Sequence, residues 1–218
     1  MDYSHILFDL DGTLTDPGVG ITRSVAYALK KAGIDVEDLS TLYPFIGPPL
    51  VDSFMRFTHM TLEQARQGVA DYREYFVPTG MYENEVYPGV RDMLQTLEKS
   101  GKTLIVATSK PEPFARRILE HFSLAPYFSL ICGSSLDETR TRKGEVIAYA
   151  LKRAGNPPAA RCVMVGDREH DVLGARENGL ACVGVTYGYG SETELTAAGA
   201  AHLCDAPQAV ARWLTAQA

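Results

Sequence analysis

The sequence is poor in cysteine and histidine, and neither residue type is spaced as a metal site would require. The four cysteines, Cys132, Cys162, Cys182 and Cys204, lack the close spacing of metal ligands. The first three lie in apolar runs, where we expect them to pack as small buried side chains. The five histidines are scattered and form no ligand motif. These absences disfavour a thiolate or imidazole metal centre and a redox site.

The sequence also lacks a long apolar run and an excess of basic residues. No run approaches the roughly 20 apolar residues of a membrane-spanning helix, and residues 1–4 lack the features of a signal peptide. We therefore expect a cytoplasmic protein with no membrane partner. A formal net charge of -6 over 218 residues argues against nucleic-acid binding, because such a surface would be basic. A small anionic ligand is still compatible, since a metal ion or lysine can reverse the field locally.

The second half of the chain alternates strand-like and helix-like segments. Short apolar runs that predict buried strands lie at residues 103–107, 128–132, 162–165 and 181–185. Between them, apolar residues recur at intervals of three and four, which predicts helices at residues 90–99, 112–122, 143–154 and 171–178. Alternating strands and helices imply right-handed crossovers and a mostly parallel sheet. The sequence therefore predicts an α/β fold.

The stretch from Pro17 to about Glu85 interrupts this alternation. It contains several helical apolar stripes, punctuated by prolines, and no convincing strand. The chain returns to the α/β pattern at Tyr87-Pro88-Gly89. We interpret the stretch as an inserted helical domain of residues 17–86, within a catalytic core of residues 1–16 and 87–218.

Two aspartates follow the first apolar run of the chain. His5 to Phe8 predicts a buried strand, and Asp9 and Asp11 come directly after it, at the end where open α/β sheets bind ligands. Two such carboxylates repel each other unless a cation or a proton separates them. A carboxylate can attack phosphorus and form an aspartyl-phosphate, and Asp9 is the better candidate because it ends the strand. Asp11 can protonate the leaving alkoxide and later deprotonate water.

Hydroxyl and lysine side chains follow the next strand and precede a later helix. At Thr108-Ser109-Lys110, hydroxyl groups and backbone amides can hold a phosphoryl oxygen. Ser109 could equally cap a helix. Lys143, just before a predicted helix, can neutralise the charge that develops in a phosphoryl-transfer transition state. The alternatives are a solvated Lys143 and Lys110 in the same role.

A second pair of aspartates, Asp167 and Asp171, follows the strand at residues 162–165. Carboxylate oxygens suit Mg²⁺, and Asp167 can complete a cage with Asp9. Asp171 can orient the lysine or a metal-bound water, or can simply be an acid at the start of a helix.

In order and spacing, these four elements resemble the haloacid dehalogenase superfamily of aspartyl-phosphate hydrolases. The resemblance implies a Rossmann-like core, Mg²⁺, Asp9 as nucleophile, Asp11 as acid/base and Lys143 as charge neutraliser. It also implies a metal site formed by Asp9, Asp167 and the Asp11 carbonyl, with Asp171 behind it. Residues predicted to bind the phosphate or the rest of the substrate are Thr13, Thr108, Ser109, Lys110, Gly47 and Pro48.

The insertion is similar to the cap of phosphoglycolate-phosphatase-like members of this superfamily. Gly47-Pro48-Pro49-Leu50 resembles the cap loop that reaches the active site in that group, and Tyr87-Pro88-Gly89-Val90 resembles its return linker. One departure is Ser109, where this group often has asparagine; it affects the turn expected to bind the phosphate and leaves the reaction class unchanged. The second aspartate of the first motif disfavours a true dehalogenase, which has no leaving oxygen to protonate.

The expected function is Mg²⁺-dependent hydrolysis of a small phosphomonoester metabolite, as in phosphoglycolate phosphatases. Arg23 is a candidate to bind a substrate carboxylate. A 5′-nucleotidase is the alternative, because the insertion holds nine of the 20 aromatic residues and a base needs a stacking face. A phosphomutase and a catalytically inactive binding module are further alternatives. We expect a monomer or a homodimer.

Overall fold

The computed structural model describes residues 2–137 and 139–216 of the chain. The chain divides into two compact units, Met1–Asp16 with Val86–Ala218, and Pro17–Glu85. We call the first the core unit and the second the helical unit.

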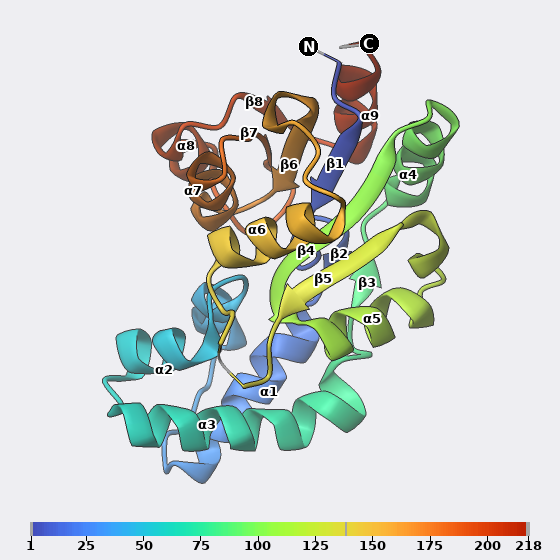
Figure 1. The fold of residues 1–218 in the computed structure, drawn as a ribbon. Helices are drawn as coiled ribbons and strands as arrows, with labels where there is room; N and C mark the ends of the chain where they lie inside the picture. Colours follow the sequence, from blue (N-terminus) through green and yellow to red (C-terminus); the bar gives the residue numbers. More distant parts are fainter. Residues whose placement is uncertain (1, 138, 217–218) are drawn as a thin grey trace. The chain divides into compact units, whose positions relative to one another are not determined.

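The core unit is built on a six-stranded sheet of order β5-β4-β1-β6-β7-β8, in which every neighbouring pair is parallel (Figure 1). The strands are β1 (His5–Phe8), β4 (Thr103–Pro111), β5 (Leu130–Ser134), β6 (Cys162–Gly166), β7 (Ala181–Val185) and β8 (His202–Cys204). The central strand β1 pairs His5 with Thr103 on one side and with Cys162 on the other. Ends of β1, β4 and β6 are therefore adjacent, which brings the residues after them together.

Helices cover both faces of this sheet. They are α4 (Val90–Lys99), α5 (Glu112–His121), α6 (Lys143–Arg153), α7 (Glu169–Glu177), α8 (Glu192–Ala198) and α9 (Pro207–Ala216), with short 3₁₀ turns η3 (Ala125–Tyr127) and η4 (Ala159–Arg161). Leu7 and Met164 pack in one cluster with Val146 of α6 and Val172 of α7. Side chains alternate along a strand, so Ile6 and Phe8 face the opposite layer, where α4 and α9 lie (Figure 1). A parallel sheet buried on both faces confirms the predicted α/β class.

The sheet differs from the prediction mainly at three strands. Strand β5 runs from Leu130 to Ser134 rather than over residues 128–132. Strand β4 continues through Thr108, Ser109 and Lys110 to Pro111, with an irregular register after Ala107. The apolar pattern ends at Ala107, so periodicity alone stops the strand there. The short edge strand β8 was not predicted, because three residues are too few to show a strand pattern.

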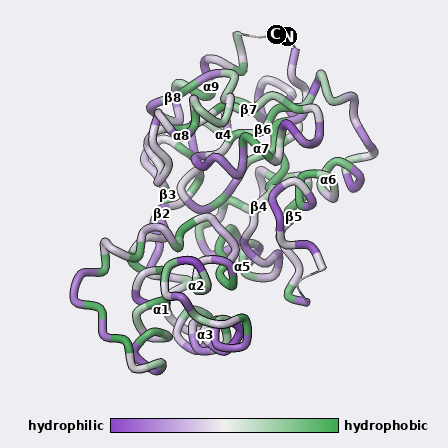
Figure 2. The backbone as a smooth tube through the Cα atoms, turned by 90° about the vertical axis from the view of Figure 1, so that its left-hand side faces the viewer, coloured by the Kyte–Doolittle hydropathy of each residue, from purple (hydrophilic) through white to green (hydrophobic). Residues whose placement is uncertain are grey.

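The helical unit contains α1 (Gly18–Lys31), η1 (Leu39–Phe45), α2 (Leu50–Thr58), α3 (Leu62–Tyr75) and the π-turn η2 (Phe76–Gly80). Helices α1 and α3 pack against each other, as do α2 and α3. Both α1 and α3 carry hydrophobic as well as hydrophilic residues (Figure 2). Gly20 allows close approach of the chain, because a Cβ there would lie 1.9 Å from the Gly80 carbonyl oxygen. Short strands β2 (Thr15–Asp16) and β3 (Glu85–Val86), at the two junctions of the units, form a separate two-stranded sheet.

Within the described part of the chain, none of the helices has the length and apolar character needed to cross a membrane.

Candidate active site

The turn after β1 places Asp9 and Asp11 at the carboxyl end of the sheet. Both residues are buried, with exposures of 4% and 7%. Amides of Leu14 and Thr15 donate to the Leu10 carbonyl and close the turn. Gly12 has φ +82°, and a Cβ there would lie 2.2 Å from the Asp167 Oδ2 atom. Glycine is therefore required both for the backbone conformation and for the approach of Asp167.

Lys143 lies at the first turn of α6 and contacts the acids directly. Its Nζ atom is 2.8 Å from Asp9 Oδ1 and 2.8 Å from Asp171 Oδ1, and it donates to the Ala107 carbonyl at 3.1 Å. The side chain is buried rather than solvated. Lys110, the rival candidate, instead pairs with Asp11, with 2.8 Å between Nζ and Oδ2. The geometry thus favours Lys143 as the cation beside Asp9.

The aspartates after β6 are fully buried. Asp167 Oδ2 accepts a hydrogen bond from the Tyr189 amide at 2.8 Å, and Oδ1 accepts one from Thr13 Oγ1 at 3.4 Å. Asp171 combines both roles considered for it. Its Oδ2 atom accepts from the Arg168 amide at the start of α7, and its Oδ1 atom pairs with Lys143.

The buried acids outnumber the cations available to them. One carboxylate oxygen from each of Asp9, Asp167 and Asp171 lies within 4.8 Å of the others. Burial raises the pKa of Asp167 well above its usual value, and raises the pKa of Asp171 to about 6 against the opposing effect of Lys143. Burial alone would lower the pKa of Lys143, but Asp171 and Asp9 raise it. The site therefore carries an excess of negative charge that a cation can relieve.

The oxygen-rich donor set fits a hard divalent cation. Asp11 Oδ1 is buried and has no hydrogen-bond partner among the described residues, and burial raises the pKa of this carboxyl despite the nearby Lys110. Carboxylates clustered at this spacing are the ligands that Mg²⁺ prefers. Asp9, Asp167 and the Asp11 carbonyl, the predicted ligand set, are compatible with such an ion.

The predicted phosphate-binding residues fall into two groups. Thr108 is buried at the end region of β4, and its hydroxyl accepts from the Lys110 amide at 3.2 Å. Ser109 lies within β4, and α5 begins only at Glu112 after Pro111, so Ser109 does not cap a helix. Thr13 donates to Asp167. Gly47 and Pro48 belong to the helical unit, between η1 and α2, where Gly47 has φ +102°.

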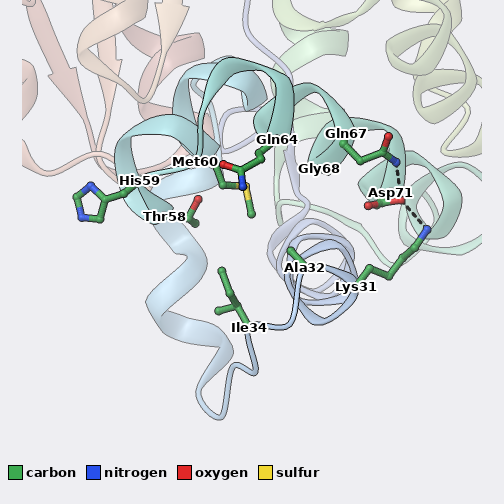
Figure 3. Close-up of a pocket in the computed structure, with 10 residues that line it drawn as sticks. All are labelled: Lys31, Ala32, Ile34, Thr58, His59, Met60, Gln64, Gln67, Gly68 and Asp71. Atoms are coloured by element: carbon green, nitrogen blue, oxygen red, sulfur yellow. Dashed lines mark hydrogen bonds and ion pairs between the residues drawn. The ribbon is translucent and has the colours of Figure 1, made fainter.

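The helical unit has a cavity of its own of about 430 Å³ (Figure 3). It is lined by Lys31, Ala32, Ile34, Thr58, His59, Met60, Gln64, Gln67, Gly68 and Asp71. Asp71 accepts hydrogen bonds from Lys31 at 2.5 Å and from Gln67 at 3.2 Å. None of the predicted site residues lines this cavity.

The segment after β7 contacts the acidic cluster, although its residues were not predicted to belong to the site. Its residues are Thr186, Tyr187, Gly188, Tyr189 and Gly190. They carry no acid and no phosphate-binding signature. The only available signal was a pair of alternating glycines directly after a strand, a pattern typical of close backbone approach.

Residues 6–185 match the family model described as haloacid dehalogenase-like hydrolase. The chain belongs to this family. The match spans both units and all four motifs, and it confirms the predicted resemblance. Members of the family generally use Mg²⁺.

Relatives of known name bear on the reaction class. A 5′-nucleotidase of Pseudomonas aeruginosa is 52% identical over 202 residues, covering 93% of this chain and 91% of that protein. Tyrosine-protein kinase PtkA of Mycobacterium tuberculosis is 41% identical over 85% of this chain, but the match spans only 62% of the kinase. A phosphoglycolate phosphatase of Pseudomonas savastanoi is 30% identical, covering 84% of this chain and 70% of that protein.

Solved structures agree with this family. A predicted phosphatase from Clostridium acetobutylicum is 48% identical and superposes with a TM-score of 0.95, covering 97% of this chain and 98% of the other. Together these findings support the expected enzyme class, a phosphoric monoester hydrolase of the haloacid dehalogenase family.

Proposed function

We propose that the protein is a Mg²⁺-dependent phosphatase that hydrolyses nucleoside 5′-monophosphates through a phosphorylated Asp9. The observation that carries the chemistry is the environment of Asp9. Its Oδ1 atom accepts from Lys143 and from the Leu10 amide, both at 2.8 Å. With Oδ1 held by two donors, Oδ2 is the oxygen available to attack phosphorus.

The two halves of the reaction use the same pair of acids. Asp9 Oδ2 forms a bond to phosphorus while the bond from phosphorus to the nucleoside oxygen breaks, and Asp11 gives that oxygen its proton. Asp11 then takes a proton from water, which attacks phosphorus and releases inorganic phosphate and the free Asp9 carboxylate. Lys143 and the Thr108 hydroxyl would stabilise the charge on the phosphoryl oxygens. A magnesium ion held by Asp9, Asp167 and the Asp11 carbonyl would neutralise further charge.

Exposed aromatic side chains of the helical unit support a nucleoside substrate over phosphoglycolate. Most aromatic residues there were expected to be core, yet Tyr27, Tyr43, Phe57 and Tyr82 are 38–48% exposed. Such rings can stack on a base. Arg23, the candidate for binding a substrate carboxylate, is instead paired with Glu83 at 2.5 Å. The 52% identity to a 5′-nucleotidase over nearly the whole of both chains points the same way.

The test is phosphate release with Mg²⁺ from a panel of nucleoside 5′-monophosphates, 2-phosphoglycolate and sugar phosphates. We expect the highest kcat/KM with a nucleoside monophosphate. Asp9→Asn should lower the turnover by more than about 10³-fold, because an amide oxygen is a far weaker nucleophile. Circular dichroism should show an unchanged fold in this variant.

Four results would contradict the proposal. Near-normal turnover by folded Asp9→Asn would exclude the mechanism. A higher kcat/KM for phosphoglycolate than for any nucleoside monophosphate would contradict the proposed substrate. Conversion of a sugar phosphate to an isomer, with little free phosphate, would indicate a mutase. A chain that only phosphorylated tyrosine, as the name of the mycobacterial relative states for that protein, would release no phosphate from the panel.

A further inference from the structure

The segment Thr186–Gly190, here called the Tyr-Gly loop, follows β7 and packs against the acidic cluster. Its contact with Asp167 is direct, because the Tyr189 amide donates to Asp167 Oδ2 at 2.8 Å. The other hydrogen bond to this carboxylate, from Thr13, is longer at 3.4 Å. The hydrogen bond from the loop amide is therefore the shorter of the two that orient this fully buried carboxylate.

Both glycines of the loop are required by proximity to this carboxylate and its turn. A Cβ on Gly188 would lie 2.2 Å from the Gly12 carbonyl oxygen and 2.6 Å from Asp167 Cβ. A Cβ on Gly190 would lie 1.8 Å from the Asp167 carbonyl oxygen. Neither glycine has a positive φ, so alanine fits the backbone conformation at both positions. What excludes it is the close approach to Asp167.

The two tyrosines fix the loop at its other side. Tyr187 donates from its hydroxyl to the Thr13 carbonyl at 3.0 Å, and its ring packs edge to face on Tyr87 with 5.2 Å between centroids. The Tyr189 hydroxyl donates to the Asp16 carboxylate. Asp16 ends β2 and Tyr87 follows β3, so the loop contacts both segments where the chain leaves and re-enters the core unit.

We propose that the Tyr-Gly loop positions Asp167 for the metal ion, with Tyr189 and Tyr187 as positioning residues; this inference rests on the proposed function only for the identity of the site. Fixing Oδ2 with an amide removes rotational freedom from the carboxylate before a cation arrives, which lowers the entropic cost of binding. Partners that orient a metal ligand commonly change metal affinity by 10–100-fold when they are removed.

The experiment is titration of Mg²⁺ into the full chain by calorimetry, with no substrate present. We expect Gly188→Ala to weaken Mg²⁺ binding by about 10–100-fold, and to recover turnover at saturating Mg²⁺ if phosphatase activity is present. Gly68→Ala is the matched control, because a Cβ there meets Phe54 at an ordinary 3.5 Å. Tyr187→Phe, which removes a single hydroxyl, should weaken binding severalfold and covers the case in which Gly188→Ala does not fold.

The outcomes separate this inference from the proposed function. Wild-type Mg²⁺ affinity in folded Gly188→Ala, or in Tyr187→Phe where the glycine variant fails to fold, overturns the positioning role. Asp167→Asn should abolish the titration signal, and failure to do so also overturns it. A wild-type chain that binds Mg²⁺ but hydrolyses no phosphomonoester would refute the proposed function alone, and the same variants would still test the loop.

Discussion

At the scale of single residues, the two lysines of the site pair with different acids. Lys143 forms ion pairs with Asp9 and Asp171, and Lys110 forms one with Asp11. Sequence alone could not choose between the lysines, because both follow or precede an element at the same end of the sheet. The structure distinguishes them, because Lys143 begins α6 and packs closely against Gly174 of α7. A Cβ on that glycine would lie 2.9 Å from Lys143 Cγ, so the glycine leaves room for the lysine side chain.

We predict that Lys143→Met reduces both turnover and stability. Turnover should fall by at least about 10²-fold, because the charge on the phosphoryl group loses its nearest cation. In EDTA, the free energy of unfolding should fall by about 3–5 kcal/mol, since buried acids lose their partner. Kinetic assays and urea unfolding measure these effects. Lys102→Met is the matched control, because its side chain is 5% exposed and pairs with exposed Asp2. Turnover within tenfold of wild type would contradict the role of Lys143.

At the scale of elements, sequence predicts most of what lies directly after an apolar strand. Asp9, Thr108 and Asp167 could be predicted at one edge of the sheet, because each follows a short apolar run and the carboxyl ends of parallel strands lie at the same edge. The Tyr-Gly loop follows β7, also a predicted strand, but its contacts with Asp167 come from the Tyr189 backbone amide and from two glycines, which have no side chain. Those leave no chemical signature in a sequence. Strand β8 was missed for a different reason, its length of three residues.

A second prediction at this scale concerns the start of α3. Thr61 accepts from the Gln64 amide at 3.3 Å, while the Gln64 side chain accepts from the Thr61 amide at 2.9 Å. This capping box satisfies two amides that the helix leaves unpaired. Thr61→Ala should lower the free energy of unfolding by about 1 kcal/mol, measured by urea denaturation. Thr79→Ala, another exposed threonine of the helical unit, should have little effect, and equal losses in the two variants would contradict the capping role.

At the scale of the whole molecule, the residues of the candidate site and the exposed aromatic residues lie in different units. Every acid and lysine of the site comes from the core unit, while the exposed aromatic residues belong to the helical unit. Residue patterns identify the first set because phosphoryl transfer requires particular charges at particular strand ends. They do not identify a substrate, because exposed and buried aromatic residues have the same spacing along a helix.

The pH dependence of global stability tests the excess acid in the core unit. The pKa of Asp171 is about 6 in the folded chain and 3.8 without the fold's influence, so the folded state binds the proton more tightly. Stability must then fall as pH rises between these two values. In EDTA, wild type should lose on the order of 3 kcal/mol relative to Asp171→Asn between pH 4 and pH 7, with little change above.

The sign of this effect can be checked with an acid shifted the other way. Hydrogen bonds from Ser135 and Thr139 lower the pKa of Asp137 to about 2, so its stabilising contribution is present above pH 4 and is lost only as pH falls further. Curves for wild type and Asp137→Asn should run parallel from pH 4 to pH 7. Urea unfolding at each pH measures both comparisons. Parallel curves for wild type and Asp171→Asn over that range would mean that the acids around Lys143 are already balanced, and that the charge argument for a bound cation is wrong.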